Sequence, residues 1–407
     1  LIMECKIIDR IKGRMGYLFY TRVYTPLKAL QIRRKKCINV IFVVTELAPW
    51  KTELLYLAML RHPRFNPVLR VLPSTENEDA KDEVIGYLEN KCYPYVFVPK
   101  EVPLQKDFKS DIIIYQKPYK WVVFPKHQFV HNKNALFCYA TYGIHNIVGN
   151  PYICNQPLFN YAWQYYFENT QSAEDHALDM DNKGRNILVT GVPIMDALLL
   201  PPSNLEVWKS QPTLKKRIIW APHFSFGDSI LGYSTFMKYY DFMLVMAQKY
   251  CDCVQFAFKP HPLLRTFLNK EWGKDRTDAY FLRWGDCPNT QVETGQYLDL
   301  FKTSDAMIHD CSSFTCEYTY MQKPVMYLLK GKDDCHRDTV DRMTQRAFDL
   351  HYKGFEEADI ERFIVQVIEG CDEMALERKQ FFEHYLLPPG GKSACQNIID
   401  AILGNKD

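Results

Sequence analysis

A buried strand that runs directly into two serines is the segment with the clearest chemical signature. The apolar run ending at His309 is followed by Asp310, Ser312 and Ser313, where a helix is predicted to begin. Free backbone N–H groups and the positive end of the helix dipole favour a phosphate there, and serine hydroxyls add donors. One turn later, the carboxylate of Glu317 could accept hydrogen bonds from a ribose. The segment predicts a nucleotide-diphosphate site, unless Asp310 or Ser312 only caps the helix.

Two other strand ends in the same half of the chain carry residues of similar chemistry. The first is Lys259-Pro260-His261-Pro262, in which two prolines restrict the backbone on both sides of the histidine. The second is the loop after Trp220-Ala221-Pro222, which contains His223 and Ser225. Because the carboxyl ends of parallel strands meet at one edge of a sheet, we expect both segments to line the same ligand site as Asp310.

The strands and helices that must position these residues alternate along the chain. Short β-branched or apolar runs are typical of strands buried on both faces. We expect such strands at 38–44, 67–72, 95–98, 111–115, 135–139, 187–191, 217–222, 254–258, 306–309 and 324–328. We expect helices at 51–61, 77–90, 235–250, 297–303, 313–321 and 394–403. This alternation predicts an α/β protein with parallel sheets covered by helices.

The pattern restarts after the proline-rich stretch 201–213, which is the predicted linker between two domains. A chain of 407 residues is long enough for two domains of ordinary size. We predict a basic N-terminal segment at 1–36, α/β domains at 37–205 and 206–385, and a helix within 386–407 that straps the halves together. Two doubly wound parallel-sheet domains facing each other across a cleft form a GT-B-like architecture.

Net charge is close to zero but unevenly distributed. The chain has 50 Lys+Arg and 48 Asp+Glu, a net charge of +2, whereas residues 1–36 hold ten basic and two acidic side chains. Apolar and aromatic residues separate these charges, which suits a membrane surface that carries anionic lipid. The alternative is an ordinary first helix packed on the body. No nucleic-acid-reading motif follows the basic run, so nucleic acid is not predicted as a partner.

Cysteine usage and hydropathy limit the location. Thirteen cysteines are scattered without a Cys-x-x-Cys pair, which favours reduced thiols in a cytoplasmic protein and argues against a structural metal site. No uncharged apolar stretch is long enough to cross a membrane.

The segment 296–324 carries a family resemblance. Asp310-Cys311-Ser312-Ser313, followed by Glu317-Tyr318 and Lys323-Pro324, resembles motifs of the CDP-glycerol glycerophosphotransferase family of teichoic-acid polymerases. The resemblance extends over about residues 135–400 and includes Lys259-Pro260-His261-Pro262, Trp220-Ala221-Pro222 and Thr190-Gly191-Val192-Pro193.

This resemblance implies a GT-B fold and a CDP-linked polyol as the donor substrate, with no further cofactor. The implied reaction transfers glycerol phosphate, or a similar polyol phosphate, to a hydroxyl of a cell-surface polymer or its lipid-linked primer, as in teichoic-acid or capsule synthesis. Family members work peripherally at the cytoplasmic face of the membrane. The first domain would then bind the acceptor and the second the donor. The implied donor-binding residues are His223, Ser225, Lys259, His261, Asp310, Ser312, Ser313 and Glu317.

The predicted catalytic residues are His145, Tyr142 and His261. The family has a His-Gly motif whose histidine is the proposed base, whereas this chain has Tyr142 before Gly143 and a histidine only at His145. An imidazole with a pKa near ~6.5 suits proton transfer better than a tyrosine with a pKa near ~10, so we favour His145. Tyr142 remains the alternative.

Other functions remain compatible with the sequence. Within enzymes, the alternatives are a GT-B glycosyltransferase or a nucleotide-sugar epimerase that uses another nucleotide sugar. Outside enzymes, the chain could be a scaffold that binds a nucleotide without a working base. The polyol, the acceptor and the oligomeric state, with a homo-oligomer as one option, are left open.

Overall fold

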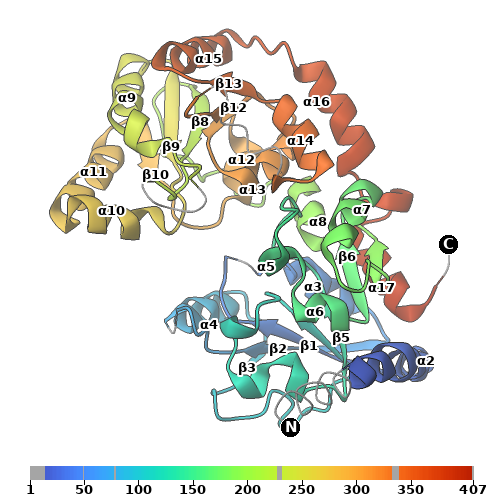
Figure 1. Ribbon diagram of the computed structural model, residues 1–407. Coiled ribbons are helices and arrows are strands. Elements are labelled where there is room, and N and C mark those ends of the chain that lie inside the picture. Colours follow the sequence, from blue (N-terminus) through green and yellow to red (C-terminus); the bar gives the residue numbers. More distant parts are fainter. Residues whose placement is uncertain (1–13, 49, 78, 227–231, 332–338, 406–407) are drawn as a thin grey trace, which may run out of the picture. The chain divides into compact units, whose positions relative to one another are not determined.

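The computed structural model describes residues 14–48, 50–77, 79–226, 232–331 and 339–405. The chain forms two compact units (Figure 1). The first comprises Leu1–Asp196 with Pro388–Asp407, and the second comprises Ala197–Leu387. Each unit is an α/β domain built on one parallel sheet, as the alternation of strands and helices predicted.

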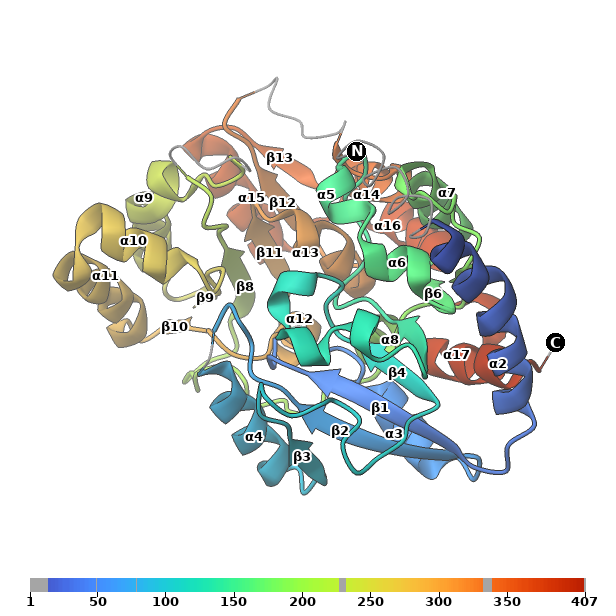
Figure 2. The ribbon, with the colours of Figure 1, turned by 60° about the horizontal axis from the view of Figure 1, so that its bottom comes forward.

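The sheet of the first unit has seven strands in the order β3-β2-β1-β4-β5-β6-β7. Figure 2 labels β1, β2, β3, β4 and β6 of this sheet. Its strands are β1 (Ile38–Val44), β2 (Phe65–Val71), β3 (Tyr95–Phe97), β4 (Ile112–Tyr115), β5 (Leu136–Tyr139), β6 (Gln164–Phe167) and β7 (Ile187–Val189). The central strands are apolar and buried, and Val40 of β1 pairs with Ile112 of β4. Its helices are α2 (Thr25–Arg33), α3 (Glu53–Arg61), α4 (Ala80–Asn90), α5 (Pro151–Cys154), α6 (Pro157–Tyr161), α7 (Thr170–Asp179) and α17 (Ala394–Leu403).

The sheet of the second unit has six strands in the order β10-β9-β8-β11-β12-β13. Its strands are β8 (Lys216–Ala221), β9 (Val254–Phe258), β10 (Thr290–Val292), β11 (Ala306–His309), β12 (Val325–Leu328) and β13 (Tyr352–Gly354). Its helices are α9 (Phe236–Lys249), α10 (Leu264–Trp272), α11 (Lys274–Asp286), α12 (Leu298–Thr303), α13 (Ser312–Glu317), α14 (Arg342–Asp349), α15 (Glu357–Glu369) and α16 (Ala375–Phe381). The boundary between the units lies within α8 (Pro193–Leu199).

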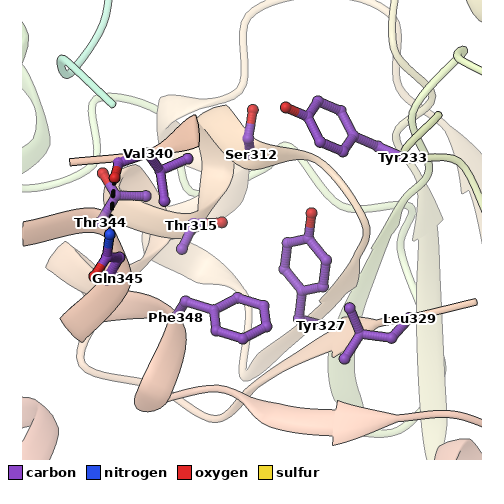
Figure 3. Close-up of a pocket in the computed structure, with 9 residues that line it drawn as sticks. All are labelled: Tyr233, Ser312, Thr315, Tyr327, Leu329, Val340, Thr344, Gln345 and Phe348. Atoms are coloured by element: carbon purple, nitrogen blue, oxygen red, sulfur yellow. Dashed lines mark hydrogen bonds between the residues drawn. The ribbon is translucent and has the colours of Figure 1, made fainter. Parts of the chain in front are cut away.

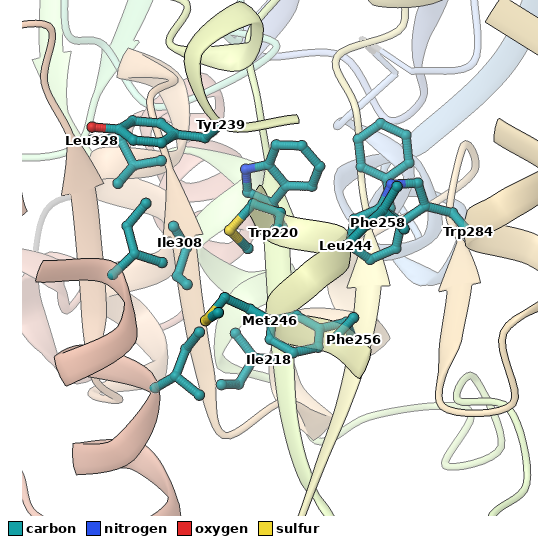
Figure 4. Packing of buried hydrophobic residues seen from close by; sticks show 14 of the residues in the cluster. Ile218, Trp220, Tyr239, Leu244, Met246, Phe256, Phe258, Trp284, Ile308 and Leu328 are labelled. Carbon is teal, nitrogen blue, oxygen red and sulfur yellow. The ribbon is translucent and has the colours of Figure 1, made fainter. Parts of the chain in front are cut away.

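Both faces of the second sheet are packed with apolar side chains. Ile218, Trp220 and Ile308 point to the face covered by α9, α11 and α15, where Trp220 stacks on Phe258 at 5.0 Å (Figure 4). Neighbouring residues such as Ile219 point to the opposite face, because successive side chains of a strand alternate. Burial on both faces explains why these strands read as continuous apolar runs.

Residues 14–33 form one helical segment in which a π-helical turn, Tyr20–Tyr24, interrupts the α-helix. The inward-facing residues Tyr20, Thr25, Ala29 and Ile32 are buried, and the spacing of five between Tyr20 and Thr25 spans the π turn. The wider turn therefore keeps one face of the segment directed at the body. Residues 1–13 of the predicted basic segment lie outside the described residues.

The last helix, α17, packs within the first unit. The carboxylate of Asp196 accepts hydrogen bonds from the backbone N–H groups of Ala394 (2.7 Å) and Cys395 (2.8 Å) at the start of this helix. Gly191 has a positive φ, and a Cβ there would lie 2.8 Å from the Ala394 side chain. The predicted linker packs on the second unit, where Trp208 is buried and donates to Thr303 Oγ1 at 2.9 Å.

The structure contains three strands that the sequence patterns did not predict: β6, β10 and β13. Each has only three or four residues, and β6 and β13 have no β-branched side chain. Within the described parts of the chain, every helix is too short or too polar to span a bilayer.

Candidate functional site

Strands β8 and β11 are neighbours in the second sheet, and the strand order reverses between them. Ala221 pairs with His309 at the last register position. The segments that begin at Pro222 and Asp310 therefore leave the sheet side by side. Ligands of doubly wound sheets bind outside the carboxyl ends of the strands at such a reversal. The three strand ends singled out in the sequence thus lie on adjacent strands, because β9 is the other neighbour of β8.

Asp310 organises the loops at this edge. Its fully buried carboxylate accepts hydrogen bonds from the N–H of His223 (2.5 Å) and from the N–H (2.6 Å) and Oγ1 (2.9 Å) of Thr235. Burial raises the pKa of Asp310 to about 6, while these hydrogen bonds oppose the shift. These hydrogen bonds hold the loop after β8 to the start of α9, and a contact between Asp310 and the donor substrate stays a prediction.

His223 is held in one tautomer by Ser225. Its Nδ1 accepts the N–H of Ser225 (3.2 Å) and lies 2.7 Å from Ser225 Oγ. Because Nδ1 accepts, the ring proton of the neutral imidazole lies on Nε2. Burial, with a smaller contribution from His261, lowers the pKa of His223 to about 3. Nε2 has no hydrogen-bond partner among the described residues, so His223 offers a neutral N–H donor.

His261 is arranged in the same way. Its Nδ1 accepts the N–H of Leu263 at 3.1 Å, and its backbone N–H donates to the carbonyl of Pro222 at 3.0 Å. Burial, with a smaller contribution from Lys259, lowers the pKa of His261 to about 4. Its ring lies 4.9 Å from that of His223. The structure therefore brings together two neutral histidines, each with Nε2 available as a donor within the part of the chain that is described.

Ser312 is the first residue of α13, two residues after Asp310 at the same edge of the sheet. Ser312, Tyr233 and Tyr327 line a small cavity of about 30 Å³, and Figure 3 shows their hydroxyls directed toward the same space. The ring of Tyr233 is 5.6 Å from that of His223, which connects the cavity to the histidine pair. Ser313 is exposed, and its Oγ lies 3.0 Å from Cys311 Sγ.

Glu317 and Lys259, the two remaining residues predicted to bind the donor substrate, are deeply buried. Glu317 is 3% exposed, and its Oε2 accepts a hydrogen bond from the Tyr297 hydroxyl at 2.6 Å. Lys259, at the end of β9, is 5% exposed, and its N–H donates to the carbonyl of Trp220 at 2.8 Å. Its positive charge lies close enough to His261 to lower the pKa of that histidine, so it belongs to the same edge of the sheet.

In the first unit, Tyr142 and His145 follow β5 but differ in environment. Tyr142 is 38% exposed, and its hydroxyl lies 3.5 Å from that of Tyr119. The side chain of His145 is only 8% exposed and is stacked on Phe167, with ring centroids 3.9 Å apart.

Both ring nitrogens of His145 have partners. Nδ1 lies 2.9 Å from both carboxylate oxygens of Glu168, and Nε2 lies 2.8 Å from the Tyr165 hydroxyl. The backbone N–H of His145 also donates to Glu168 at 2.7 Å. A carboxylate at Nδ1 fixes the proton there and leaves Nε2 as the basic nitrogen. His145 therefore has the tautomer of a general base, with Tyr165 hydrogen-bonded to its basic nitrogen.

Five residues that complete these arrangements were absent from the sequence predictions: Tyr233, Thr235, Tyr327, Tyr165 and Glu168. The run Tyr233-Ser234-Thr235 before a predicted helix was a usable signal, because hydroxyl residues favour helix starts. Tyr165 and Glu168 gave no such signal, since β6 itself was not recognised.

Comparison with known proteins gives a family. The family model of CDP-Glycerol:Poly(glycerophosphate) glycerophosphotransferase matches residues 162–403, more than half of the chain. A search of curated protein sequences finds no match.

Solved structures show the same fold at low sequence identity. A variant of the wall teichoic acid polymerase TagF aligns with a TM-score of 0.61 and 15% identity, covering 98% of each chain. Another TagF variant, soaked with CDPG, aligns with a TM-score of 0.60 and 14% identity and also covers 98% of each chain. UDP-GlcNAc 2-epimerase from Neisseria meningitidis, bound to UDP-GlcNAc, aligns with a TM-score of 0.58 and 14% identity. The alignment covers 90% of this chain and 100% of the epimerase.

These comparisons confirm the predicted fold class, two parallel-sheet α/β domains of the GT-B type, and the predicted enzyme class. The family match includes the edge of the second sheet that carries His223, His261 and Ser312, which we call the histidine–serine edge. The chain belongs to the CDP-glycerol:poly(glycerophosphate) glycerophosphotransferase family.

Proposed function

We propose that the edge formed by His223, His261 and Ser312 binds the diphosphate of CDP-glycerol. The observation that carries this proposal is the contact between two neutral imidazoles whose Nε2–H groups have no partner among the described residues. Neutral donors hydrogen-bond phosphate oxygens without requiring a buried cation, and hydrogen bonds to a charged acceptor are among the stronger ones. Ser313, which is exposed at the same helix start, is a further proposed donor.

The bound donor would react by phosphoryl transfer. An acceptor hydroxyl attacks the phosphorus that carries glycerol, its P–O bond forms, and the bond to the CMP phosphate breaks as CMP leaves. The acceptor loses its proton to a base, and the departing phosphate carries the negative charge. The histidine pair is suited to stabilise that charge, because its N–H groups are already oriented by their Nδ1 contacts.

We propose His145 as the base, with Tyr142 positioning the acceptor or a phosphate oxygen. The Glu168 carboxylate at 2.9 Å supports this role, since it would stabilise the imidazolium that forms. An acceptor hydroxyl would have to replace the Tyr165 hydroxyl as the partner of Nε2. This requirement makes the proposal testable by removing that hydroxyl.

We further propose that the chain binds the cytoplasmic surface of an anionic membrane through its N-terminal helical segment. Apolar side chains are exposed along one stripe of that segment: Met15, Leu18, Phe19, Val23, Leu27 and Leu30. Of these, Phe19 is 62% exposed and Leu27 57%. The exposed cations Arg34 and Lys36 lie at its end. Such a combination suits a lipid-linked primer or a cell-surface polymer as acceptor.

The nucleotide is tested by calorimetric titration of CDP, UDP and GDP into the full chain. The proposal expects CDP to bind most tightly. Tighter binding of UDP would favour a glycosyltransferase or an epimerase, since the epimerase neighbours share the fold. Absence of binding by all three would remove the nucleotide site itself. Binding of CDP without turnover of CDP-glycerol would favour a scaffold that binds the nucleotide but does not catalyse transfer.

A further inference from the structure

The first unit contains a cavity whose lining includes none of the residues of the histidine–serine edge. It measures about 670 Å³ and is bounded on one side by the helical segment Tyr17–Arg33. Trp163, Arg185 and Asn186, together with other residues around β6 and β7, form the opposite wall. All the lining residues belong to the first unit, so the cavity is a feature of that unit alone.

Three arginines line this cavity, and none of its lining residues in the described part of the chain is acidic. Arg33 is anchored: its guanidinium donates to the carbonyls of Ala401 and Ile402, each at 3.3 Å, and lies over the Trp163 ring at 5.7 Å. Arg22 and Arg185 are exposed, and neither has a hydrogen bond or ion pair with any described residue. Like charges gathered in a concave space repel one another, and an anion bound between them relieves that repulsion.

The polar wall is rigid and adds no competing negative charge. The amide of Asn186 donates to the carbonyls of Phe159 (2.7 Å) and Ala162 (2.8 Å). Asn182 is 4% exposed and donates to Asn186 Oδ1 at 2.6 Å. Guanidinium groups bind tetrahedral phosphates through paired N–H donors, so two exposed arginines beside this polar wall suit such an anion.

The position of the cavity indicates where that phosphate comes from. Leu30 lines the cavity and is also 51% exposed as part of the apolar stripe of the same helical segment. The anion-binding space and the surface suited to acyl chains are therefore continuous at this residue. A soluble phosphate would have no use for the apolar stripe.

We propose that Arg22, Arg33 and Arg185 form a binding site for the phosphate of a lipid headgroup, whose acyl chains lie along the apolar stripe. This inference rests on the proposed membrane location but is separate from the donor site. It assigns to the N-terminal segment recognition of phosphate rather than attraction to negative charge in general.

The test compares two kinds of vesicle by co-sedimentation of the full chain. One kind contains phosphatidylcholine with phosphatidic acid, and the other replaces the phosphatidic acid with a carboxylate lipid at the same surface charge. The wild-type chain should prefer the phosphate vesicles by about tenfold, equivalent to one good charge-assisted contact. The double variant Arg22→Gln/Arg185→Gln should lose this preference.

The matched control is Arg34→Gln/Lys36→Gln, which removes the same charge from exposed residues outside the cavity. This control should bind both kinds of vesicle more weakly but keep the preference. A preference retained by the cavity variant, or absent from the wild type, would overturn the inference while leaving the membrane location intact. Failure of the wild type to bind any vesicle would remove both. Calorimetric binding of inorganic phosphate as tight as that of the lipid would overturn the lipid source.

Discussion

The imidazole rings of His223 and His261 lie 4.9 Å apart at the carboxyl edge of the second sheet, in an edge-to-face arrangement. Each ring uses Nδ1 to accept a backbone N–H from the residue two positions further along its own loop. Two different loops thus present the same tautomer at one place. Because burial keeps both rings neutral, they can lie this close without repulsion.

Replacing His261 with alanine should weaken binding of CDP-glycerol. Loss of one hydrogen bond to a charged phosphate is worth about 1.5–3 kcal/mol, or roughly 10- to 150-fold in the dissociation constant. Calorimetric titration measures the change. His384→Ala, an exposed histidine of the same unit, is the control and should bind as the wild type does. Equal affinity of the two variants would exclude His261 from the donor site.

Asp310→Asn should destabilise the second unit and also weaken donor binding. The amide would turn an N–H donor toward groups that are themselves donors, the N–H of His223 or of Thr235. A buried acceptor lost in this way costs about 3 kcal/mol of unfolding free energy, measurable by denaturant titration.

Asp299→Asn is a matched control for that variant. Asp299 also accepts three hydrogen bonds, from the N–H and Oγ of Ser203 and the N–H of Asn204, but these are exposed to solvent. It should cost less than about 1 kcal/mol, because water replaces the lost contacts. Equal losses in the two variants would contradict the organising role of Asp310.

Stability should fall as the pH is lowered below about 6.5. Burial lowers the pKa of His176 and of His309 to about 3 and that of His351 well below its usual value. The unfolded chain therefore binds more protons than the folded chain below pH 6.5, so folding free energy is lost as the pH falls toward the folded pKa values. With folded pKa values of about 3, His176 and His309 each contribute roughly 2 kcal/mol between pH 6.5 and 5, and His351 acts in the same direction.

Asp310 acts in the opposite direction, because its raised pKa of about 6 stabilises the folded state at low pH and that stabilisation is lost as the pH rises. Because the buried histidines outnumber Asp310, we expect the free energy of unfolding to increase with pH over this range. Denaturant titration at several pH values measures this slope. His309→Phe should flatten it, whereas His384→Ala should not, and a stability that is independent of pH from 7 to 5 would refute the prediction.

How far sequence patterns could predict this molecule is clear at its two histidine sites. His261 and His223 follow strands that were predicted from their apolar residues, and adjacent parallel strands bring their ends together, so their meeting was predictable. The partners of His145 were not, because Tyr165 lies on β6, a four-residue strand with no β-branched residue. All four residues of β6 are buried because of tertiary packing, which local sequence patterns do not reveal.

The basic N-terminal segment shows a second limit. Charge counting treats Arg33, Arg34, Lys35 and Lys36 as equivalent. In the structure, Arg33 donates to two carbonyls at the end of α17, and Lys35 forms a 2.6 Å ion pair with the buried carboxylate of Asp111. Two of the four cations therefore hold the fold together. Only long-range contacts distinguish these two from Arg34 and Lys36.

The variants His145→Ala, Tyr142→Phe and Tyr165→Phe separate the two candidates for the base. If His145 removes the acceptor proton, His145→Ala should lower turnover by about 10²–10⁴-fold with CDP affinity unchanged. Tyr165→Phe should then keep or increase turnover, because it frees Nε2. Tyr142→Phe should cost less than His145→Ala. Loss of turnover in Tyr142→Phe with an active His145→Ala would reverse the assignment.

Membrane binding should depend on the exposed apolar stripe. Phe19→Gln/Leu27→Gln should reduce co-sedimentation with anionic vesicles by tenfold or more, since inserting each side chain is worth about 1.5–3 kcal/mol. Folding stability should stay unchanged because both side chains are exposed. Leu214→Gln, which removes an exposed leucine outside the segment, is the control. Undiminished binding by the stripe variant would favour the alternative of an ordinary packed helix.

The most direct test is release of CMP from CDP-glycerol by the full chain in the presence of a glycerophosphate-primed acceptor. We expect acceptor-dependent CMP release by the wild type, strongly reduced in His223→Ala/His261→Ala and retained in His384→Ala. UDP-GlcNAc should be neither cleaved nor epimerised in the same assay. CMP release that survives the double substitution, or turnover of UDP-GlcNAc in its place, would contradict the assignment of the histidine pair as the donor site of a CDP-glycerol glycerophosphotransferase.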